Sequence, residues 1–410
     1  MTATTAEIAA RRSFVDVWLI SIGHALTHWY PATFYLLLPL IGSELGLNYA
    51  QIGSILTVQF AAGAISNIPG GLIVDSVGRK GVLMAISLAW VGIPYLLMGF
   101  SHAYWLLLTC ATLVGIGNNL WHPTAIPLLG NRFPGRRGLV MSFHSMAANV
   151  GDALAPLAAG ALLNVLSWRD VMIANVLPGL IMAAVLLIYF GRPQPGDELA
   201  AGLRIARSGA GMLRVFATLL RNRTVTLLSI GSAFRTMTQT SLLTFLPLYL
   251  AHELALEPVW IGACMFGLQA AGFAAAPIAG HLSDRMGRRQ VIVSSLAVSG
   301  VVLIFMALAG RSLAFVFFIA VLGFFLFAIR AVLQAWLLDA TPPEMGGTSV
   351  GFLFGIQALG GAIGPFISGV VADHYGLTAT FYFLALTIVI ANLFMFLTPM
   401  PDRAAKAVVP

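Results

Sequence analysis

GLIVDSVGRK, residues 71–80, returns as GHLSDRMGRR, residues 280–289, 209 positions further along the chain. Other residues of the first half recur at the same separation; the pairs are Glu44 and Glu253, Ile52 and Ile261, Gly53 and Gly262, Pro134 and Pro343, Gly138 and Gly347, Gly151 and Gly360, Pro156 and Pro365, and Gly160 and Gly369. Because chance does not hold one register over such distances, the chain contains two copies of one unit. In an apolar chain, this duplication is typical of a transporter built from two helical bundles.

The composition is that of an integral membrane protein. Hydrophobic residues make up 59% of the 410 residues and charged residues only 9%, whereas soluble domains carry about 25% charged residues. The mean hydropathy is +0.91. Spans of about 20 apolar residues cross a bilayer, and we predict twelve of them, at 14–42, 49–74, 81–100, 104–131, 138–166, 170–191, 224–251, 258–281, 290–309, 313–340, 348–371 and 379–399. The expected fold is therefore an all-α membrane protein with two pseudo-symmetric six-helix bundles.

The basic residues indicate how the chain lies in the bilayer. Of the 22 lysines and arginines, eighteen fall in loops or termini on one side of the predicted spans and only Arg169 and Arg311 on the other. This asymmetry is the positive-inside pattern, so we expect both termini in the cytoplasm. It also explains the net charge of +7 without a nucleic-acid partner.

The predicted bundles cover residues 1–191 and 224–410, and a cytoplasmic linker covers 192–223. Within the linker, spaced arginines and apolar residues from Leu203 to Phe216 are compatible with an amphipathic helix on the inner leaflet. A simple basic tether between the bundles is the favoured interpretation.

The repeated loop resembles the signature of the major facilitator superfamily, and the second copy is the fuller one. The resemblance covers almost the whole chain. It implies alternating access by a monomeric multi-pass protein in the inner membrane of a bacterium. It also implies that the loop residues latch a cytoplasmic gate, the alternative being that they only fix topology; they are Gly71, Asp75, Gly78, Arg79, Gly280, Asp284, Gly287 and Arg288.

A narrower resemblance connects the first bundle with the fosmidomycin-resistance-like exporters. It rests on His24, on LLPL at 37–40 and on WHP at 121–123. Thr124 and His28 depart from the pattern of that branch, so its substrate is not carried over. The glycines and proline of 151–160 and 360–369 resemble the motif of drug antiporters, with Ala155 in place of one glycine. Close helix packing alone explains the same residues, so this motif favours export only weakly.

Ionisable residues within membrane spans face the protein interior and indicate function. They are His24, His28, His122, His144, Asp152, Arg235 and Arg330. Spans one, four, seven and ten line the central cavity in the resembled superfamily, and each carries a histidine or arginine here. The pair at positions 24 and 28 shares one helix face, and proton or substrate binding is the favoured role. Polar packing and metal ligation are the alternatives, but no cysteine or carboxylate joins the pair within its span, so we expect no metal site.

The two arginines predict an anionic ligand. A guanidinium stays charged, so inside a membrane it needs an acidic partner or an anion. Asp152 is the one clear carboxylate in the predicted core and cannot neutralise both arginines. The predicted substrate-binding set is His24, His28, Asn118, His122, Arg235, Gln239, Arg330 and Gln334, and the proton-coupling candidates are Asp152, His24, His28 and His122.

These features predict a transporter and not an enzyme. The chain lacks a Gly-Lys phosphate loop and the third glycine of a dinucleotide loop, so no cofactor is expected and transport must draw on an ion gradient. The favoured function is proton-coupled export of a small organic anion or anionic drug. The alternatives are proton-linked uptake of a carboxylate-type metabolite and a membrane sensor without flux.

Overall fold

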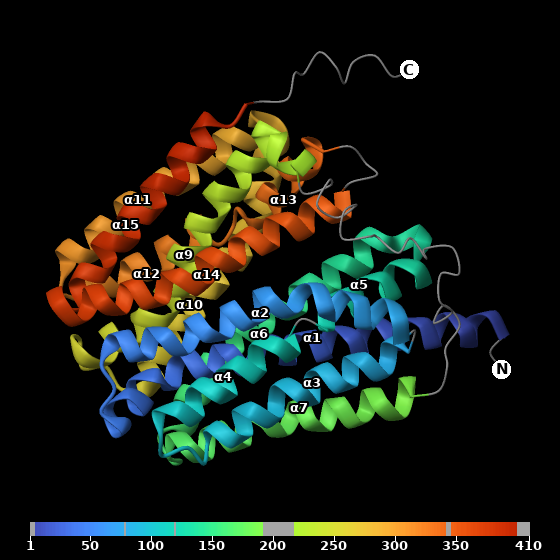
Figure 1. Ribbon diagram of the computed structural model, residues 1–410, viewed down its shortest axis with the longest axis horizontal. Coiled ribbons are helices and arrows are strands. Elements are labelled where there is room, and N and C mark those ends of the chain that lie inside the picture. The colour runs from blue at the N-terminus through green and yellow to red at the C-terminus, as the bar shows by residue number, and fades with distance from the viewer. Residues whose placement is uncertain (1–4, 78, 119, 192–216, 342–345, 400–410) are drawn as a thin grey trace. The chain divides into compact units, whose positions relative to one another are not determined.

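The computed structural model describes residues 5–77, 79–118, 120–191, 217–341 and 346–399, and within them it contains helices and no strand. The first half holds α1 (Thr5–Leu45), α2 (Tyr49–Val77), α3 (Lys80–Met98), α4 (Tyr104–Asn118), α5 (Trp121–Arg132), a short 3-10 turn η1 (Pro134–Arg136), α6 (Arg137–Leu162) and α7 (Trp168–Phe190). The second holds α9 (Arg223–His252), α10 (Pro258–Met286), α11 (Arg288–Ala309), α12 (Ala314–Leu326), α13 (Arg330–Asp339), α14 (Gly346–Tyr375) and α15 (Leu377–Leu397) (Figure 1). The all-α prediction is confirmed.

Counting α4 with α5 and α12 with α13 as broken spans, these helices match the twelve predicted spans. By length and apolarity alone, seven spans among the described residues qualify as membrane-crossing. The amphipathic helix predicted at 203–216 lies outside the described residues.

Spans four and ten, predicted at 104–131 and 313–340, each consist of two helices. The first break follows Asn118 and the second follows Leu326, and the chain re-enters a helix at Trp121 and Arg330. These two starts are again 209 residues apart, so the break belongs to the repeated unit. In α5 the break is followed by Pro123, which is tolerated in a first turn because its missing N–H needs no partner there. In transporters, paired interrupted helices in the two halves point to the binding site.

The chain forms two compact units that exchange short segments. Unit 1 comprises 1–47, 58–204 and 250–266, and unit 2 comprises 48–57, 205–249 and 267–410. The start of α2 is held in unit 2 because the Asp373 carboxylate accepts the N–H groups of Tyr49 and Ala50 at 2.8 and 2.9 Å. The units thus differ from the predicted halves, 1–191 and 224–410, mainly by these exchanged segments.

Glycines bring the main helices of each unit into backbone contact. In unit 1, α1 packs mainly on α6, and a Cβ on Gly151 would lie 2.1 Å from the Ala25 carbonyl oxygen. In unit 2, a Cβ on Gly360 would lie 2.1 Å from the Ala233 carbonyl oxygen. Both glycines belong to the repeat, so the duplication extends to the helix crossings, where small residues permit close approach.

Gly151→Ala is expected to destabilise the protein, because the added methyl has no room against the α1 backbone. Overpacking of this kind costs about 1–3 kcal/mol. Gly138→Ala in the same helix is the matched control, since a Cβ there meets nothing within 4 Å. Apparent melting temperatures of the purified variants in detergent check this; equal values for both variants would mean that the α1–α6 crossing tolerates a larger residue.

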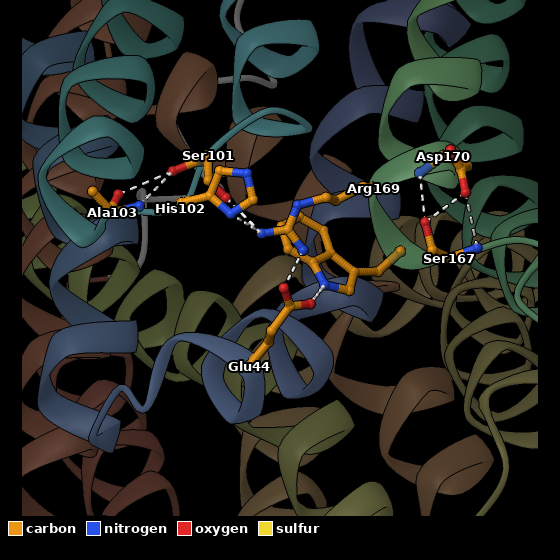
Figure 2. A network of polar contacts seen from close by, with 8 residues as sticks. Glu44, Ser101, His102, Ala103, Ser167, Arg169 and Asp170 are labelled. Atoms are coloured by element: carbon orange, nitrogen blue, oxygen red, sulfur yellow. Dashed lines mark hydrogen bonds and ion pairs between the residues drawn. The ribbon is translucent and has the colours of Figure 1, made fainter.

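A polar network joins the end of α1 to the start of α7 (Figure 2). The Glu44 carboxylate accepts from the Trp168 indole N–H and pairs with the Arg169 guanidinium. Arg169 also stacks over the Trp168 ring at 4.2 Å and donates to the Ser101 carbonyl oxygen at 2.8 Å. Next to them, Ser167 and Asp170 form a capping box that starts α7. The network fixes one end of unit 1 outside the predicted spans.

Glu44→Gln is expected to reduce the acid sensitivity of folding. The hydrogen bonds from Trp168 and Arg169 lower the pKa of Glu44 below its ordinary value of 4.5. A carboxyl with a lowered pKa stabilises the fold above its ordinary pKa, and this contribution is lost as the pH falls below about 4.5. The melting temperature of the variant should therefore vary less with pH in that range than that of the wild type, and an unchanged slope would contradict it.

Candidate functional site

Histidines from three helices of unit 1 meet at His24. The Nδ1 atom of His24 on α1 lies 2.7 Å from the backbone carbonyl oxygen of His144 on α6. Its Nε2 atom lies 3.1 Å from the Nε2 atom of His122 on α5. Because a carbonyl oxygen can only accept, the His24 Nδ1 atom carries a hydrogen, and Nε2 of the neutral ring presents a lone pair towards His122. His24 is only 4% exposed, so this orientation is held inside the unit.

Aromatic rings fix the His24 imidazole further. The His144 ring is parallel to it, with centroids 3.8 Å apart, and the Trp121 ring is parallel at 6.3 Å. Gly23 makes room for this indole, since a Cβ there would lie 2.3 Å from a Trp121 ring carbon. His144 was recognised as an intramembrane histidine but was missing from the predicted site. Its contact with His24 depends on the α1–α6 crossing, which no sequence spacing reveals.

A second polar pair lies one helical turn further along α1. The Nδ1 atom of His28 is 3.0 Å from a carboxylate oxygen of Asp152 on α6, and the side chains are 22% and 24% exposed. Asp152 directly follows Gly151, the residue that lets α6 touch α1. The candidate acid is thus paired with a histidine, and within the described residues it forms no ion pair with an arginine.

In unit 2, Arg235 on α9 is buried with little compensation. Its side chain is 3% exposed, and one Nη1–H donates to the Gln239 Oε1 atom at 2.8 Å. Among the described residues, the Nε atom has no hydrogen-bond partner and no carboxylate lies within ion-pair distance. Arg330, the first residue of α13, lies near enough to interact with Arg235 electrostatically. Two cations therefore share this part of unit 2.

The other predicted binding residues are less engaged. Asn118 is exposed at the last position of α4, beside the first helix break, and Gln334 is half-buried one turn after Arg330. Neither side chain forms a hydrogen bond with other described residues. The structure thus gathers His24, His28, His122 and Asp152 in unit 1 and Arg235, Gln239 and Arg330 in unit 2.

The second loop signature is well defined. Arg288 pairs with Asp284 one turn earlier, donates to the Ser283 hydroxyl at 2.7 Å and approaches the Asp339 carboxylate at 3.5 Å. Gly287 has φ of 105°, a left-handed conformation that favours glycine, and Gly280 has open space around it.

In the first copy, Arg79 donates to the Gly191 carbonyl oxygen at 2.9 Å. Gly71 and Asp75 fall in α2 where side chains lie outside the described part of the chain, as does Gly78 altogether. The gating role of both loops stays a prediction.

Comparison with known proteins places this architecture in a family. The chain is 26% identical to the fosmidomycin resistance protein of Escherichia coli over 98% of its own length and 97% of that protein. It is 25% identical to the phosphoglycerate transporter protein of Salmonella typhimurium, covering 92% of this chain and 87% of that one. The crystal structure of a bacterial homologue of the human lysosomal transporter Spinster, inward-facing and occupied, shares the fold with a TM-score of 0.81 at 18% identity over 94% and 96% of the chains. The model of the Major Facilitator Superfamily matches residues 17–265 and 228–410, and the chain belongs to this superfamily of membrane transporters.

Proposed function

We propose that the protein is a proton-coupled secondary transporter that exports a small organic anion or anionic drug by alternating access. Arg235 is the observation that carries the proposal. A buried guanidinium with one amide partner and no carboxylate among the described residues has donors left for a ligand. Isolated buried charge is costly, and an anion that accepts from the Nε–H and Nη–H groups offsets that cost with charge-assisted hydrogen bonds.

Arg330 and the two glutamines extend this site. Arg330 adds a second positive charge close to the first, which a ligand with more than one anionic oxygen would relieve. Gln239 orients the Arg235 guanidinium by accepting a hydrogen bond from it, and Gln334 lies one turn after Arg330 on α13. Two of the similar proteins are named as transporters of anions, one of phosphoglycerate and one of hexuronate. These names support an anionic ligand.

The His28–Asp152 pair supports proton coupling. Each side chain is partly accessible, and the His28 Nδ1 atom lies 3.0 Å from an Asp152 carboxylate oxygen, so a proton can pass directly between them. Coupling in unit 1 and anion binding in unit 2 assign the two tasks to separate sets of residues. His24 and His122 are the alternative proton carriers, since their Nε2 atoms lie 3.1 Å apart and a proton can pass between them.

Counterflow with purified protein in proteoliposomes tests the function. Vesicles loaded with an unlabelled carboxylate or phosphorylated anion should take up the labelled compound without any ion gradient, and a pH gradient should then drive net accumulation. Exchange of cations or neutral sugars but of no anion would overturn the anionic substrate. Binding without exchange would favour the sensor instead.

Export is preferred to uptake because the fosmidomycin resistance protein and multidrug resistance protein MdtG are among the similar proteins. Proton-linked uptake of a carboxylate-type metabolite remains the second candidate, because the same arginines would serve it. Deletion of the gene separates them: sensitivity to toxic anions indicates export, and lost growth on an anionic nutrient indicates uptake. We also propose a monomer in a bacterial inner membrane. The distribution of basic residues favours an orientation with both termini in the cytoplasm.

A further inference from the structure

We propose that His24, His28 and His122 form a binding site for a divalent transition-metal ion of the zinc type. One ring nitrogen of each histidine lies within 4.8 Å of those of the other two. The residues come from α1 and α5 of unit 1, and the site does not involve the arginines of unit 2. Metal binding can therefore be tested separately from anion binding at the arginines.

The orientation of the rings favours a metal over a chance cluster. The Nδ1 atom of His24 is committed to the His144 carbonyl oxygen, which leaves Nε2 as a lone-pair donor. That atom lies 3.1 Å from Nε2 of His122. Two nitrogens bound to one tetrahedral zinc ion at 2.0–2.1 Å lie about 3.3 Å apart. The two imidazoles thus already have the separation that a shared metal requires.

The groups behind the rings are those that support metal-binding histidines. Such histidines nearly always give their second ring nitrogen to a carboxylate or a backbone carbonyl, which fixes the tautomer and raises the basicity of the ligand. His24 has the His144 carbonyl oxygen in this place, and His28 has the Asp152 carboxylate at 3.0 Å from Nδ1. Nε2 of His28 is then the nitrogen available to the metal.

The donor set determines which ions fit. Three imidazoles suit zinc and its first-row neighbours and are poor ligands for magnesium and calcium, which prefer oxygen. Three protein ligands leave a fourth position for water.

The sequence did not predict this site because a third ligand was expected within the first span. The third imidazole instead comes from α5, 98 residues from His24.

Metal binding requires neutral imidazoles, so protons and the metal compete for the same nitrogens. Affinity should therefore fall as the pH is lowered. The competition offers a way to hold unit 1 in one protonation state when the metal is abundant.

Titration of metal-stripped, full-length protein in detergent tests the proposal. With Zn²⁺ measured by competition against a chromogenic chelator, we expect one high-affinity ion per chain. Co²⁺ should give the visible d–d absorption of a four-coordinate site. Asp152→Asn, which changes only the group behind a ligand, should weaken binding about 10- to 100-fold. His122→Asn and His28→Asn should weaken it further.

Two exposed histidines of the second half serve as matched controls. His281→Asn and His374→Asn should bind Zn²⁺ as the wild type does. Size-exclusion profiles verify that each variant is folded, and Zn²⁺ should raise the melting temperature of the wild type and of both controls only. Absence of a wild-type site, or equal binding by a variant with all three ligands replaced by asparagine, would overturn the proposal. Arg235→Ala should bind Zn²⁺ normally, so failure of one proposal leaves the other standing.

Discussion

Arg235→Ala is expected to abolish measurable transport while leaving the protein folded and inserted. Removal of one partner from a buried, hydrogen-bonded charge pair costs about 2–5 kcal/mol. At 1.4 kcal/mol for each factor of ten, substrate affinity should fall by about 30-fold to about 4,000-fold. The fold should tolerate the change, because in the described structure the arginine donates only to Gln239 and forms no ion pair. Counterflow at saturating and at low substrate measures the loss.

Two further variants separate charge from shape at this site. Arg235→Lys keeps the cation but loses the planar fork, so it should recover only part of the affinity. Arg330→Ala should also abolish anion flux, because the two cations share the same part of unit 2. Arg311→Ala, at an exposed position, is the control and should transport normally. Normal flux in both Arg235→Ala and Arg330→Ala would remove the cationic-site hypothesis.

The fold could be predicted from the sequence because the duplication and the apolar composition extend over the whole chain. Twelve spans and the two loop signatures follow from residues that keep one register, such as Asp75 with Asp284 and Gly151 with Gly360. The helix breaks did not follow, because a stretch of spanning length shows where the chain crosses the bilayer and not whether its helix is continuous. Only the second-half break lacks a nearby proline, so the local sequence there offers no marker.

The sequence could predict which residues belong to the site. It could not predict which of their side chains contact one another. Histidines, Asp152 and Arg235 were identified because ionisable groups within apolar spans are rare. Whether Asp152 meets an arginine or a histidine depends on where α6 crosses α1, and that crossing is set by the missing side chain of Gly151. The pairing with His28 keeps Asp152 eligible as a proton carrier, a role that a permanent arginine partner would have ended.

Asp152→Asn is expected to uncouple anion flux from the pH gradient. The amide oxygen can still accept from the His28 Nδ1–H group, so the contact between α1 and α6 should survive, but the side chain no longer takes up a proton. If one proton moves with each anion, a gradient of one pH unit supplies about 1.4 kcal/mol, or about tenfold accumulation. The variant should lose this accumulation and retain counterflow.

Glu257→Gln, an exposed acid at the start of α10, should keep both activities and serves as the control. The assays need a strong chelator in every vesicle, since Asp152→Asn is also expected to weaken metal binding at His28. With metal removed, a loss of coupling is attributable to the carboxyl group itself. Unchanged coupling in Asp152→Asn would reassign the proton to His24, His28 or His122, and His24→Asn would then be the variant that decides, because its Nε2 atom faces His122 at 3.1 Å.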